Sequence, residues 1–241
     1  MNKLSVIISA YKNPDLVAIH VRECMASTRI PDEIIVVNDC DGMEEELKNK
    51  LLALKRNTKI IYAVILPPKI PYNYTGARNL GFWLSSGNLI SIEDQDHIPH
   101  KDFYAETEKI LDEHPELMRC KSKWRWEILE EDILTKPVEQ WVSQGGRCPH
   151  HDCAVLRREL YLKIKGYDER FAGEYGWSNT NWRRRLKMAG YEEAGNAGFQ
   201  YVVKTPKTRG LSYRNFRLAK QNKTIQSPLG ILNFQYEFEV L

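Results

Sequence analysis

The sequence predicts an α/β fold, with a mostly parallel, mixed sheet flanked by helices in a single domain. Three short runs, 4–9, 33–37 and 59–65, are almost continuously apolar and rich in β-branched residues, as in strands buried on both faces of a parallel sheet. Segments that suit amphipathic helices separate these runs. The chain therefore begins in the order βαβαβ, which predicts right-handed crossovers within one sheet. With 241 residues, it is long enough to bury a large core.

The bulk composition is that of an ordinary globular protein, with 42% hydrophobic and 28% charged residues. The net charge of +3 is too small to imply nucleic-acid binding by itself. The charge is unevenly distributed, because residues 194–236 contain no Asp or Glu. The basic residues of this stretch are Lys204, Lys207, Arg209, Arg214, Arg217, Lys220 and Lys223. They form either a solvated surface or a patch for an anionic acceptor, a membrane surface or a nucleic acid.

The cellular compartment is predicted from the N-terminal residues, the lengths of the apolar stretches and the cysteines. Residues 1–3 lead directly into the first run, which does not fit a secretory signal. No apolar stretch of the sequence approaches membrane-spanning length. The five cysteines are scattered, which favours reduced thiols. We therefore expect a cytoplasmic protein.

Helix signals follow the first and second predicted strands. Asn13 or Pro14 opens the first helix, along which His20 is expected to lie without a chemical role. A second helix, rich in Glu and Lys, is predicted over 44–54, and a third over 74–81. These helices complete the alternating pattern of the first half.

Acidic residues gather where two predicted strands end. A fourth apolar run, 89–92, is followed by Asp94 and Asp96, whose spacing suits a hard divalent cation that also holds a diphosphate. Asp39 follows the second strand, where acids commonly meet a ribose or base, although a turn or a helix cap is the alternative. Arg78, near the start of the third helix, would face the same edge and pair with a diphosphate or with the carboxylates. Because ligands of open α/β sheets bind at this edge, the sequence predicts a metal–nucleotide site.

The second half is less regular. It predicts a helix over 102–113 and strands over 117–126, 153–156 and 199–203, whereas 130–141 shows no clear period. The second of these segments carries Trp124, whose ring would stack on a sugar or pack in the core. Two cysteines and two histidines crowd residues 148–153 without a second ligand pair at the spacing of structural sites, which argues against zinc.

Four segments, in this order, resemble those of family 2 glycosyltransferases, which have the Rossmann-like GT-A fold. They are residues 6–11, 35–39, 76–81 and 87–96. In the family, two aspartates follow the second strand, and an Ala-Arg-Asn-x-Gly segment and a D-x-D motif come after them at about this spacing. Each segment alone is a weak signal, whereas four in register are specific.

The resemblance implies a role for each matching residue. Asp39 matches the aspartate that reads the base, with Asn38 in place of its usual acidic neighbour, and Arg78 matches an arginine near the base and diphosphate. Asp94 matches the acid near the ribose and metal, and Asp96 the acid that ligates Mn²⁺ or Mg²⁺, which stabilises the leaving nucleoside diphosphate. The nucleotide-sugar-binding residues implied are Ala10, Tyr11, Asp39, Arg78, Asp94 and Gln95, and the metal ligands are Asp94 and Asp96.

The implied metal site has few protein ligands. His97 stands where another Asp is common in the family, and it is either a ligand or a polar residue of the edge. Family members often place a third ligand, usually His, late in the chain, but the last histidine here is His151. Metal binding would then rest on Asp96, the diphosphate and water.

Residues 166–186 resemble the second hallmark of the family, in which Gly-Phe/Tyr-Asp-Glu is followed by Gly-Trp and an acidic E-D-x-D. The galactosyltransferase-like Gly-Trp fits, but Ser178-Asn179-Thr180-Asn181 replaces the acids. In inverting members one of these acids is the general base, and an amide cannot accept that proton. Ser178 and Asn179 also suit a helix N-cap.

Three explanations of the missing acids stay open. Glu174 supplies the carboxylate; or the enzyme is retaining, as are polypeptide N-acetylgalactosaminyltransferases with Glu-Asn-x-Glu in this place; or transfer has been lost. The catalytic candidates are Glu174 and Asn179. The acceptor-binding candidates are Trp124, His150, His151 and Trp177.

The chain is thus divided into a nucleotide-sugar-binding half (1–100), an acceptor-binding half of the same domain (101–205) and a basic C-terminal extension (206–241). Its apolar end, 225–241, would dock as a terminal strand or mediate self-association. We expect a metal-assisted glycosyltransferase that moves a sugar from a nucleotide-diphosphate donor, a UDP-sugar by preference, to a hydroxyl of a glycan, lipid-linked or other acceptor, with nucleic acid open as a partner.

Two other functions compete with sugar transfer. The first is a catalytically silent sugar-nucleotide or glycan-binding module of the same fold, which the missing acids favour. The second is a nucleotidyltransferase, which would need a glycine-rich basic loop after the first strand. Residues 11–14 are a poor version of such a loop.

Overall fold

The computed structural model describes residues 2–54, 58–67, 70–150, 153–204, 211–221 and 234–241. The strands are β1 (Leu4–Ala10), β2 (Glu33–Asn38), β3 (Lys59–Ile65), β4 (Leu89–Asp94), β5 (His97–Pro99), β6 (Arg119–Ile128), β7 (Gly146–Arg147), β8 (Ala154–Arg157), β9 (Gly195–Val203) and β10 (Tyr236–Val240). The helices are α1 (Pro14–Met25), α2 (Glu44–Ala53), α3 (Tyr74–Leu84), α4 (Phe103–Glu113), α5 (Glu130–Thr135), α6 (Arg158–Lys163), α7 (Ser178–Met188) and α8 (Tyr213–Gln221), with single 3₁₀ turns η1 (Val138–Gln140) and η2 (Glu169–Phe171).

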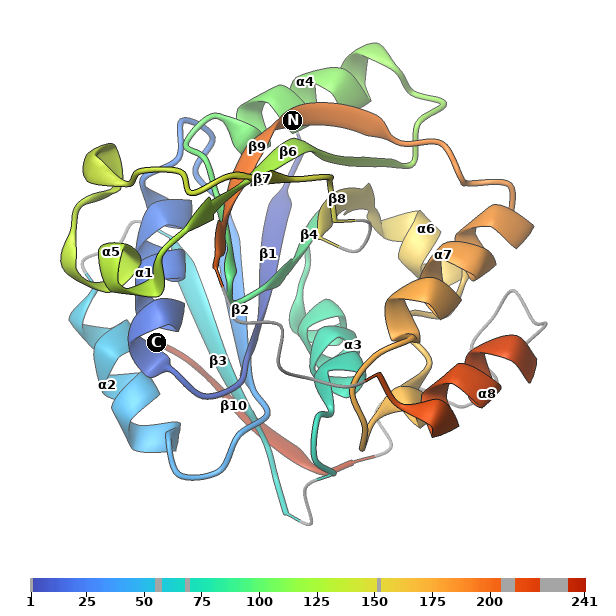
Figure 1. The fold of residues 1–241 in the computed structure, drawn as a ribbon, viewed down its shortest axis with the longest axis horizontal. Helices are drawn as coiled ribbons and strands as arrows, with labels where there is room; N and C mark the ends of the chain where they lie inside the picture. The colour runs from blue at the N-terminus through green and yellow to red at the C-terminus, as the bar shows by residue number, and fades with distance from the viewer. Residues whose placement is uncertain (1, 55–57, 68–69, 151–152, 205–210, 222–233) are drawn as a thin grey trace.

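One mixed sheet connects both halves of the chain (Figure 1). Its strands follow the order β10-β3-β2-β1-β4-β8-β6-β9-β5, and β7 pairs with β6. The four strands β1 to β4 are parallel, which confirms the predicted βαβαβ start. From β4 onward the pairing changes, because β8 is antiparallel to both β4 and β6, whereas β6 and β9 are parallel. The predicted mixed, mostly parallel sheet in a single domain is therefore confirmed.

Helices cover both faces of the sheet, which explains the uninterrupted burial of β1 and β2. One core cluster joins β1 to α1, α2 and α4, through residues such as Val17, Leu47 and Phe103. A second cluster joins the other face to α3, α6 and α7, through Leu80, Leu160 and others. This two-sided burial is the usual setting of parallel strands.

Local sequence signals position the first helices. Asn13 caps α1 by accepting a hydrogen bond from the N–H of Leu16 over 3.1 Å, and Pro14 occupies the first turn. α3 packs closely on β1 at Gly81, where an added Cβ would lie 2.3 Å from Cγ2 of Ile7. A larger residue at this position would push α3, and with it Arg78, away from the sheet.

Several irregular segments adopt structure that the sequence left open or predicted differently. Residues 130–141, which show no clear period, contain α5 and η1. The N-cap of α7 is Trp177 in a left-handed conformation (φ 68°), so the N-cap reading of Ser178 and Asn179 is wrong. The predicted terminal strand forms as β10, which pairs antiparallel with β3. The preceding part of the basic extension, 222–233, lies outside the described residues, as do 205–210.

None of the helices within the described ranges is both long enough and apolar enough to cross a bilayer.

Candidate functional site

The C-terminal ends of the central strands meet at one edge of the sheet (Figure 1). The parallel register places Ala10 beside Asn38 and Ser9 beside Asp94. The backbone N–H of Asp39 donates to the carbonyl of Ala10 over 3.0 Å. The structure thus brings residues that are predicted to bind the nucleotide sugar from the ends of three strands to the same edge.

Gln95 ties the end of β4 to the end of β1. Its Oε1 accepts from the backbone N–H of Tyr11 over 2.7 Å, and its Nε2 donates to the Tyr11 carbonyl over 2.9 Å. Both ends of the side-chain amide are therefore used to hold the two strand ends together. A contact of Gln95 with the donor stays a prediction.

Arg78 is the buried cation of the site. Its side chain is 1% exposed, and one Nη donates to Oδ1 of Asp94 over 2.5 Å. The guanidinium also lies over the ring of Tyr167, 4.7 Å from its centroid. Burial by itself would raise the pKa of Asp94, but the interactions with Arg78 and then His97 outweigh it and hold that pKa below its usual range. Asp94 is therefore ionised at neutral pH, as a metal ligand must be.

His97 connects Asp96 to a second arginine. Its Nδ1 lies 2.9 Å from Oδ1 of Asp96, and its Nε2 lies 2.7 Å from a Nη of Arg125. Because a guanidinium can only donate, Nε2 accepts and Nδ1–H donates to Asp96. Burial would raise the pKa of Asp96, but the interaction with His97, which includes this hydrogen bond, lowers it. Arg125, which the sequence analysis missed, also donates to the carbonyl of Cys148 over 2.8 Å.

His150 and Asn179 join this cluster from the second half of the chain. The ring centroid of His150 lies 5.0 Å from that of His97, and its Nε2 lies 3.2 Å from Nδ2 of Asn179. Burial, and then the nearby His97, lowers the pKa of His150 to about 3, so its imidazole is neutral at pH 7. The thiol of Cys153, whose pKa is raised by burial and by Asp94, donates to that carboxylate over 3.6 Å.

The remaining acceptor-side candidates lie near the start of α8. The carboxylate of Glu174 accepts a hydrogen bond from the hydroxyl of Ser212. The ring of Trp177 lies 4.7 Å from that of Phe216. Of the two catalytic candidates, Asn179 thus contacts the cluster around the D-x-D motif, whereas the carboxylate of Glu174 is bonded to the α8 side.

Trp124 lies away from this cluster. Side chains alternate along β6, so Trp124 is on the face opposite Arg125, and it is 41% exposed. A cavity of about 210 Å³ lies beside it on that face, lined by Trp126, Ile128, Trp141, Ser143, Phe199 and Tyr201. His151 lies outside the described residues. The acceptor roles of both residues stay predictions.

A row of tyrosines connects the donor edge to the acceptor-side loop. The ring of Tyr72 lies 5.0 Å from that of Tyr11 and 6.1 Å from that of Tyr175. The N–H of Gly173 donates to the carbonyl of Pro71 over 2.7 Å, which holds the two loops together. Tyr72 has a positive φ of 56°, a conformation that bulky residues seldom adopt. No pattern in the sequence identifies Tyr72, since its neighbours in this row come from distant segments.

A buried polar network supports the D-x-D motif from below. Glu93 accepts from the hydroxyls of Tyr104 and Ser91 over 2.7 and 2.6 Å, and it lies 2.6 Å from Nε2 of His20. The other nitrogen of His20 lies 3.2 Å from the carbonyl of Gln95. His20 lies along α1, as predicted, and its fully buried imidazole connects this helix to the strand that carries the acids. An acid inside an apolar strand was the signal that a buried partner exists.

The cation site fits the predicted hard metal. Asp94, Asp96 and His97 each offer a ligand atom, and these atoms lie within 4.8 Å of one another. The two carboxylates are 29% and 34% exposed, so a metal–diphosphate complex has access to them. Carboxylate oxygens suit Mn²⁺ and Mg²⁺. Both nitrogens of His97 are already engaged, by Asp96 and Arg125, so the two carboxylates are the better ligands.

A second group of possible ligands consists of His97, His150 and Cys153. It shares His97 with the first group. The guanidinium that faces His97 disfavours a further cation there.

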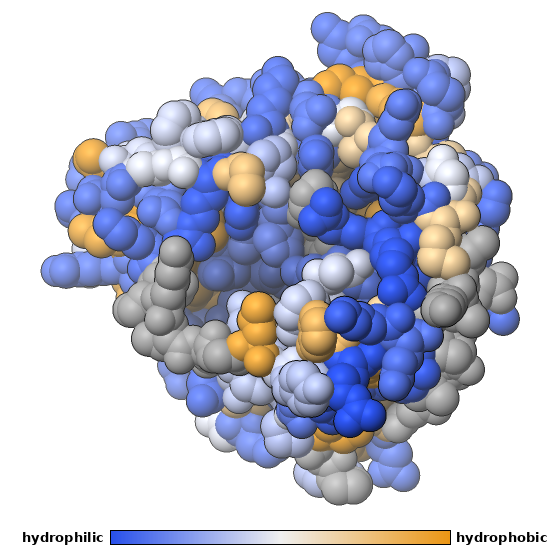
Figure 2. Space-filling view, turned by 45° about the vertical axis from the view of Figure 1, so that its right-hand side comes forward, coloured by the Kyte–Doolittle hydropathy of each residue, from blue (hydrophilic) through white to orange (hydrophobic). Residues whose placement is uncertain are grey.

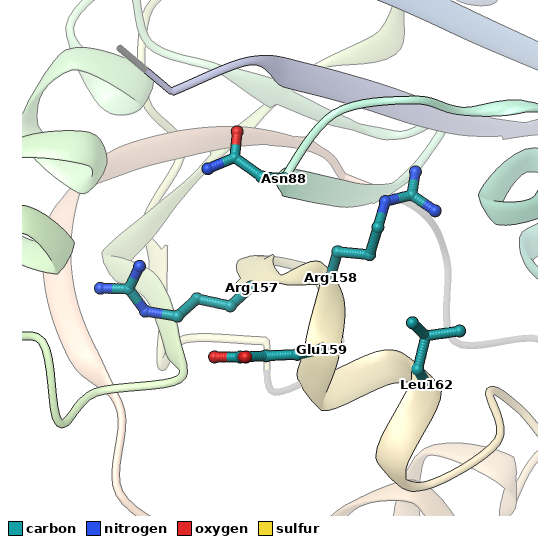
Figure 3. Close-up of a pocket in the computed structure, with 5 residues that line it drawn as sticks. All are labelled: Asn88, Arg157, Arg158, Glu159 and Leu162. Atoms are coloured by element: carbon teal, nitrogen blue, oxygen red, sulfur yellow. The ribbon is translucent and has the colours of Figure 1, made fainter.

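A second cavity lies at the opposite end of β4 from the acids of the D-x-D motif. It has a volume of about 400 Å³ and is lined by Asn88, Arg157, Arg158, Glu159 and Leu162. Figure 3 shows the two arginines pointing away from each other. Arg157 donates to the carbonyls of Leu111 and Leu117, and Arg158 donates to those of Ser85 and Gly87. These guanidinium groups serve the structure rather than a ligand.

Comparisons with known proteins identify the family of this chain. Residues 5–164 match the model of the family described as Glycosyl transferase family 2. "Probable glycosyltransferase YdaM" of Bacillus subtilis (strain 168) is 27% identical over 208 residues, which cover 78% of this chain and 47% of that protein. The chain thus spans less than half of the length of this relative.

Solved structures share the fold. A mannosyltransferase, PcManGT from Pyrobaculum calidifontis in complex with GDP-Man and Mn²⁺, superposes with a TM-score of 0.59 at 16% identity, over 91% of this chain and 61% of that one. S. aureus TarS 1-349 in complex with UDP-GlcNAc has a TM-score of 0.56 at 14% identity, over 90% of this chain and 65% of that one. At such identities the likeness shows the fold alone. Because the family match covers more than half of the chain, this protein belongs to glycosyl transferase family 2 and has the GT-A fold.

Proposed function

We propose that this protein transfers a sugar from a nucleotide-diphosphate donor, a UDP-sugar by preference, to an acceptor hydroxyl with the help of Mn²⁺ or Mg²⁺. The observation that carries the proposal is the convergence of Asp39, Arg78, Asp94 and Asp96 at the C-terminal edge of β1, β2 and β4. Structures with the same fold contain GDP-Man with Mn²⁺, or UDP-GlcNAc, which supports a nucleotide sugar as donor and a divalent metal as cofactor.

The residues that bind the nucleotide sugar would act by placing charged groups around its diphosphate. Asp94 and Asp96 would hold the cation, which when bound neutralises the charge that develops on the leaving diphosphate. Arg78 keeps Asp94 ionised and fixes one of its oxygens. Asp39 would accept hydrogen bonds from the base near Tyr11, at the end of β1.

The acceptor half would position the hydroxyl. Asn179 lies against His150 in the cluster, so we propose that this pair orients the acceptor. An amide cannot remove the proton, whereas the carboxylate of Glu174 accepts one hydrogen bond from Ser212 and keeps further lone pairs with which it would act as the base. The anomeric configuration of the product, read by NMR, tests this point: inversion requires such a base, and retention does not.

The donor site is tested by thermal unfolding with a panel of UDP-, GDP- and dTDP-sugars, with and without Mn²⁺. A donor present at about 100 times its Kd stabilises the protein by roughly 2.7 kcal/mol, which raises Tm by about 5–11 °C in a chain of this size. The stabilising donor is then used in a transfer assay that measures release of the nucleoside diphosphate. We expect both signals to require the metal.

Asp96→Asn is the decisive variant, because it keeps the shape of the side chain and removes its charge. We expect it to lose the Mn²⁺-dependent stabilisation and the turnover. The matched control is Asp112→Asn, which changes an exposed acid on α4 that bonds to Asn2. Full turnover by Asp96→Asn would refute the proposed metal site.

The amides at the start of α7 favour a second candidate, a catalytically silent sugar-nucleotide or glycan-binding module. Such a module would show the metal-dependent stabilisation but would release no nucleoside diphosphate from any donor, with or without acceptor. The same pair of assays therefore separates the two functions.

A further inference from the structure

α7 and α8 form one rigid corner beside the acceptor-side loop. Arg184 donates to the carbonyl of Ala219 over 2.6 Å, which joins the two helices. The buried Asn215 donates to the carbonyls of Phe171, Glu174 and Gly176. The position of α8 is therefore fixed by its buried side, and the rest of the helix faces outward (Figure 1).

The outward side of this corner is basic. Its exposed cations are Arg183, Arg214, Arg217 and Lys220, which we name the α7–α8 basic surface. Within the described part of the chain, none of the four forms a salt bridge with an acid. Arg214 donates to two carbonyl groups, and Lys220 lies over the ring of Phe216, so neither charge is neutralised. Hydrophilic residues predominate on the face that Figure 2 brings forward.

Acidic residues near the corner compensate little of this charge. Glu174 is exposed and its carboxylate is bonded by Ser212 at the start of α8. Glu192 is paired with Lys187 at the end of α7, 3.2 Å away. The carboxylates of Glu174 and of the exposed Glu193 thus stand against four cations, so the net charge of the corner stays positive.

Two large apolar side chains are exposed next to these cations. Leu211 is 61% exposed and Tyr213 is 72% exposed. Beside cations, a leucine and a tyrosine can enter the interface of a bilayer, whereas phosphate contacts with a nucleic acid would not use the leucine. Basic residues flanked by an aliphatic and an aromatic anchor are typical of surfaces that rest on the headgroup region of a bilayer.

We propose that the α7–α8 basic surface docks on an anionic bilayer, with its four cations at the headgroups and with Leu211 and Tyr213 in the interface. The inference does not depend on the proposed sugar transfer. Each cation near such a surface strengthens partitioning by about fivefold. Docking here would hold the acceptor-side loop, which carries Glu174 and Trp177, close to the membrane surface.

The test is co-sedimentation of the whole chain with lipid vesicles. We expect binding to vesicles of POPC containing about 30% POPG in about 0.1 M NaCl, a marked loss of binding in about 0.5 M NaCl, and no binding to POPC alone. Arg217→Glu/Lys220→Glu should weaken partitioning at least about 25-fold, because two cations are lost and two repulsive charges are added. Leu211→Ser/Tyr213→Ser should weaken it while leaving its salt dependence unchanged.

The matched control is Lys101→Glu/Lys109→Glu, an equal charge change at exposed positions of and before α4. It should bind as the wild type does. Equal losses in both charge variants would mean that only the net charge matters, which would overturn the proposal. Tight binding of a 40-nucleotide RNA that the Arg217→Glu/Lys220→Glu variant alone loses, with no vesicle binding, would assign the surface to nucleic acid instead. Far-ultraviolet circular dichroism checks that each variant is folded.

Discussion

Replacing Arg78 by Met removes the buried positive charge that faces Asp94 and keeps a side chain of similar length. At 2.5 Å and an effective dielectric constant of about 20, the gross attraction of this pair is roughly 7 kcal/mol. Because Met carries no charge, the variant avoids the cost of desolvating the guanidinium, and this saving offsets several kcal/mol of the lost attraction. We therefore expect the free energy of unfolding to fall by about 3 kcal/mol, the lower end for breaking a buried pair, because Asp94 is 29% exposed. The corresponding loss in Tm is about 6–12 °C.

The effect should depend on pH in one direction. The pKa of Asp94 in the folded protein lies below its ordinary value, chiefly because Arg78 outweighs the effect of burial. Its ionised state therefore adds stability that is fully present above about pH 4 and is lost as the pH falls through the folded pKa. The difference in the free energy of unfolding between the wild type and Arg78→Met should be constant near neutral pH and should become smaller below about pH 4.

This difference in the free energy of unfolding is measured by urea unfolding in EDTA from pH 3 to 7, with circular dichroism as the signal. Asp94→Asn and the double variant complete a cycle that isolates the pair. Arg22→Met is the control, since Arg22 pairs with Glu23 at a surface site where its side chain is 48% exposed. A loss below about 1 kcal/mol in Arg78→Met, or an equal loss in the presence and absence of the Asp94 carboxylate, would refute the reasoning.

Three further predictions concern parts that support the site. His20→Leu should lower the free energy of unfolding by about 3 kcal/mol, measured with urea, because it leaves Glu93 buried without its imidazole partner; a change as small as that of an exposed His114→Leu control would contradict this. Gln95→Ala should cost about 1–2 kcal/mol in the same measurement, because the N–H of Tyr11 loses its acceptor; donor binding lost with unchanged stability would show that Gln95 serves the donor instead. With a thiol reagent, Cys148 should react first in the folded protein, since it is the exposed cysteine; a Cys148→Ser variant that reacts as fast as the wild type would contradict this.

Much of the fold could be predicted because parallel strands leave a strong local pattern. β1, β2 and β3 are almost continuously apolar, and Asn13-Pro14 is a strong helix start, so these elements match the structure closely. Residues 130–141 could not be predicted in this way, since α5 is only six residues long. A helix of that length is stabilised by its packing, here through Ile133, rather than by a periodic sequence.

The residues of the site also divide into those that the sequence could identify and those that it could not. Asp39, Arg78, Asp94 and Asp96 could be identified because strand ends and helix starts face a known edge of the sheet. Arg125 could not, because nothing local shows that a strand arginine between two tryptophans turns toward a histidine. The hydrogen bond between His20 and Glu93 could not be predicted either, since the two residues are far apart in the sequence.

The sequence by itself determined the α/β class, the order of the first strands and the acids at their ends, because burial on both faces and turn residues are written into consecutive positions. Only the tertiary structure decided which polar groups share a space. It placed Asn179 against His150, the carboxylate of Glu174 against Ser212, and Trp124 on the far face of β6. These pairings depend on crossovers and strand register that connect residues distant in the chain, and such distances leave no periodic trace in a single sequence.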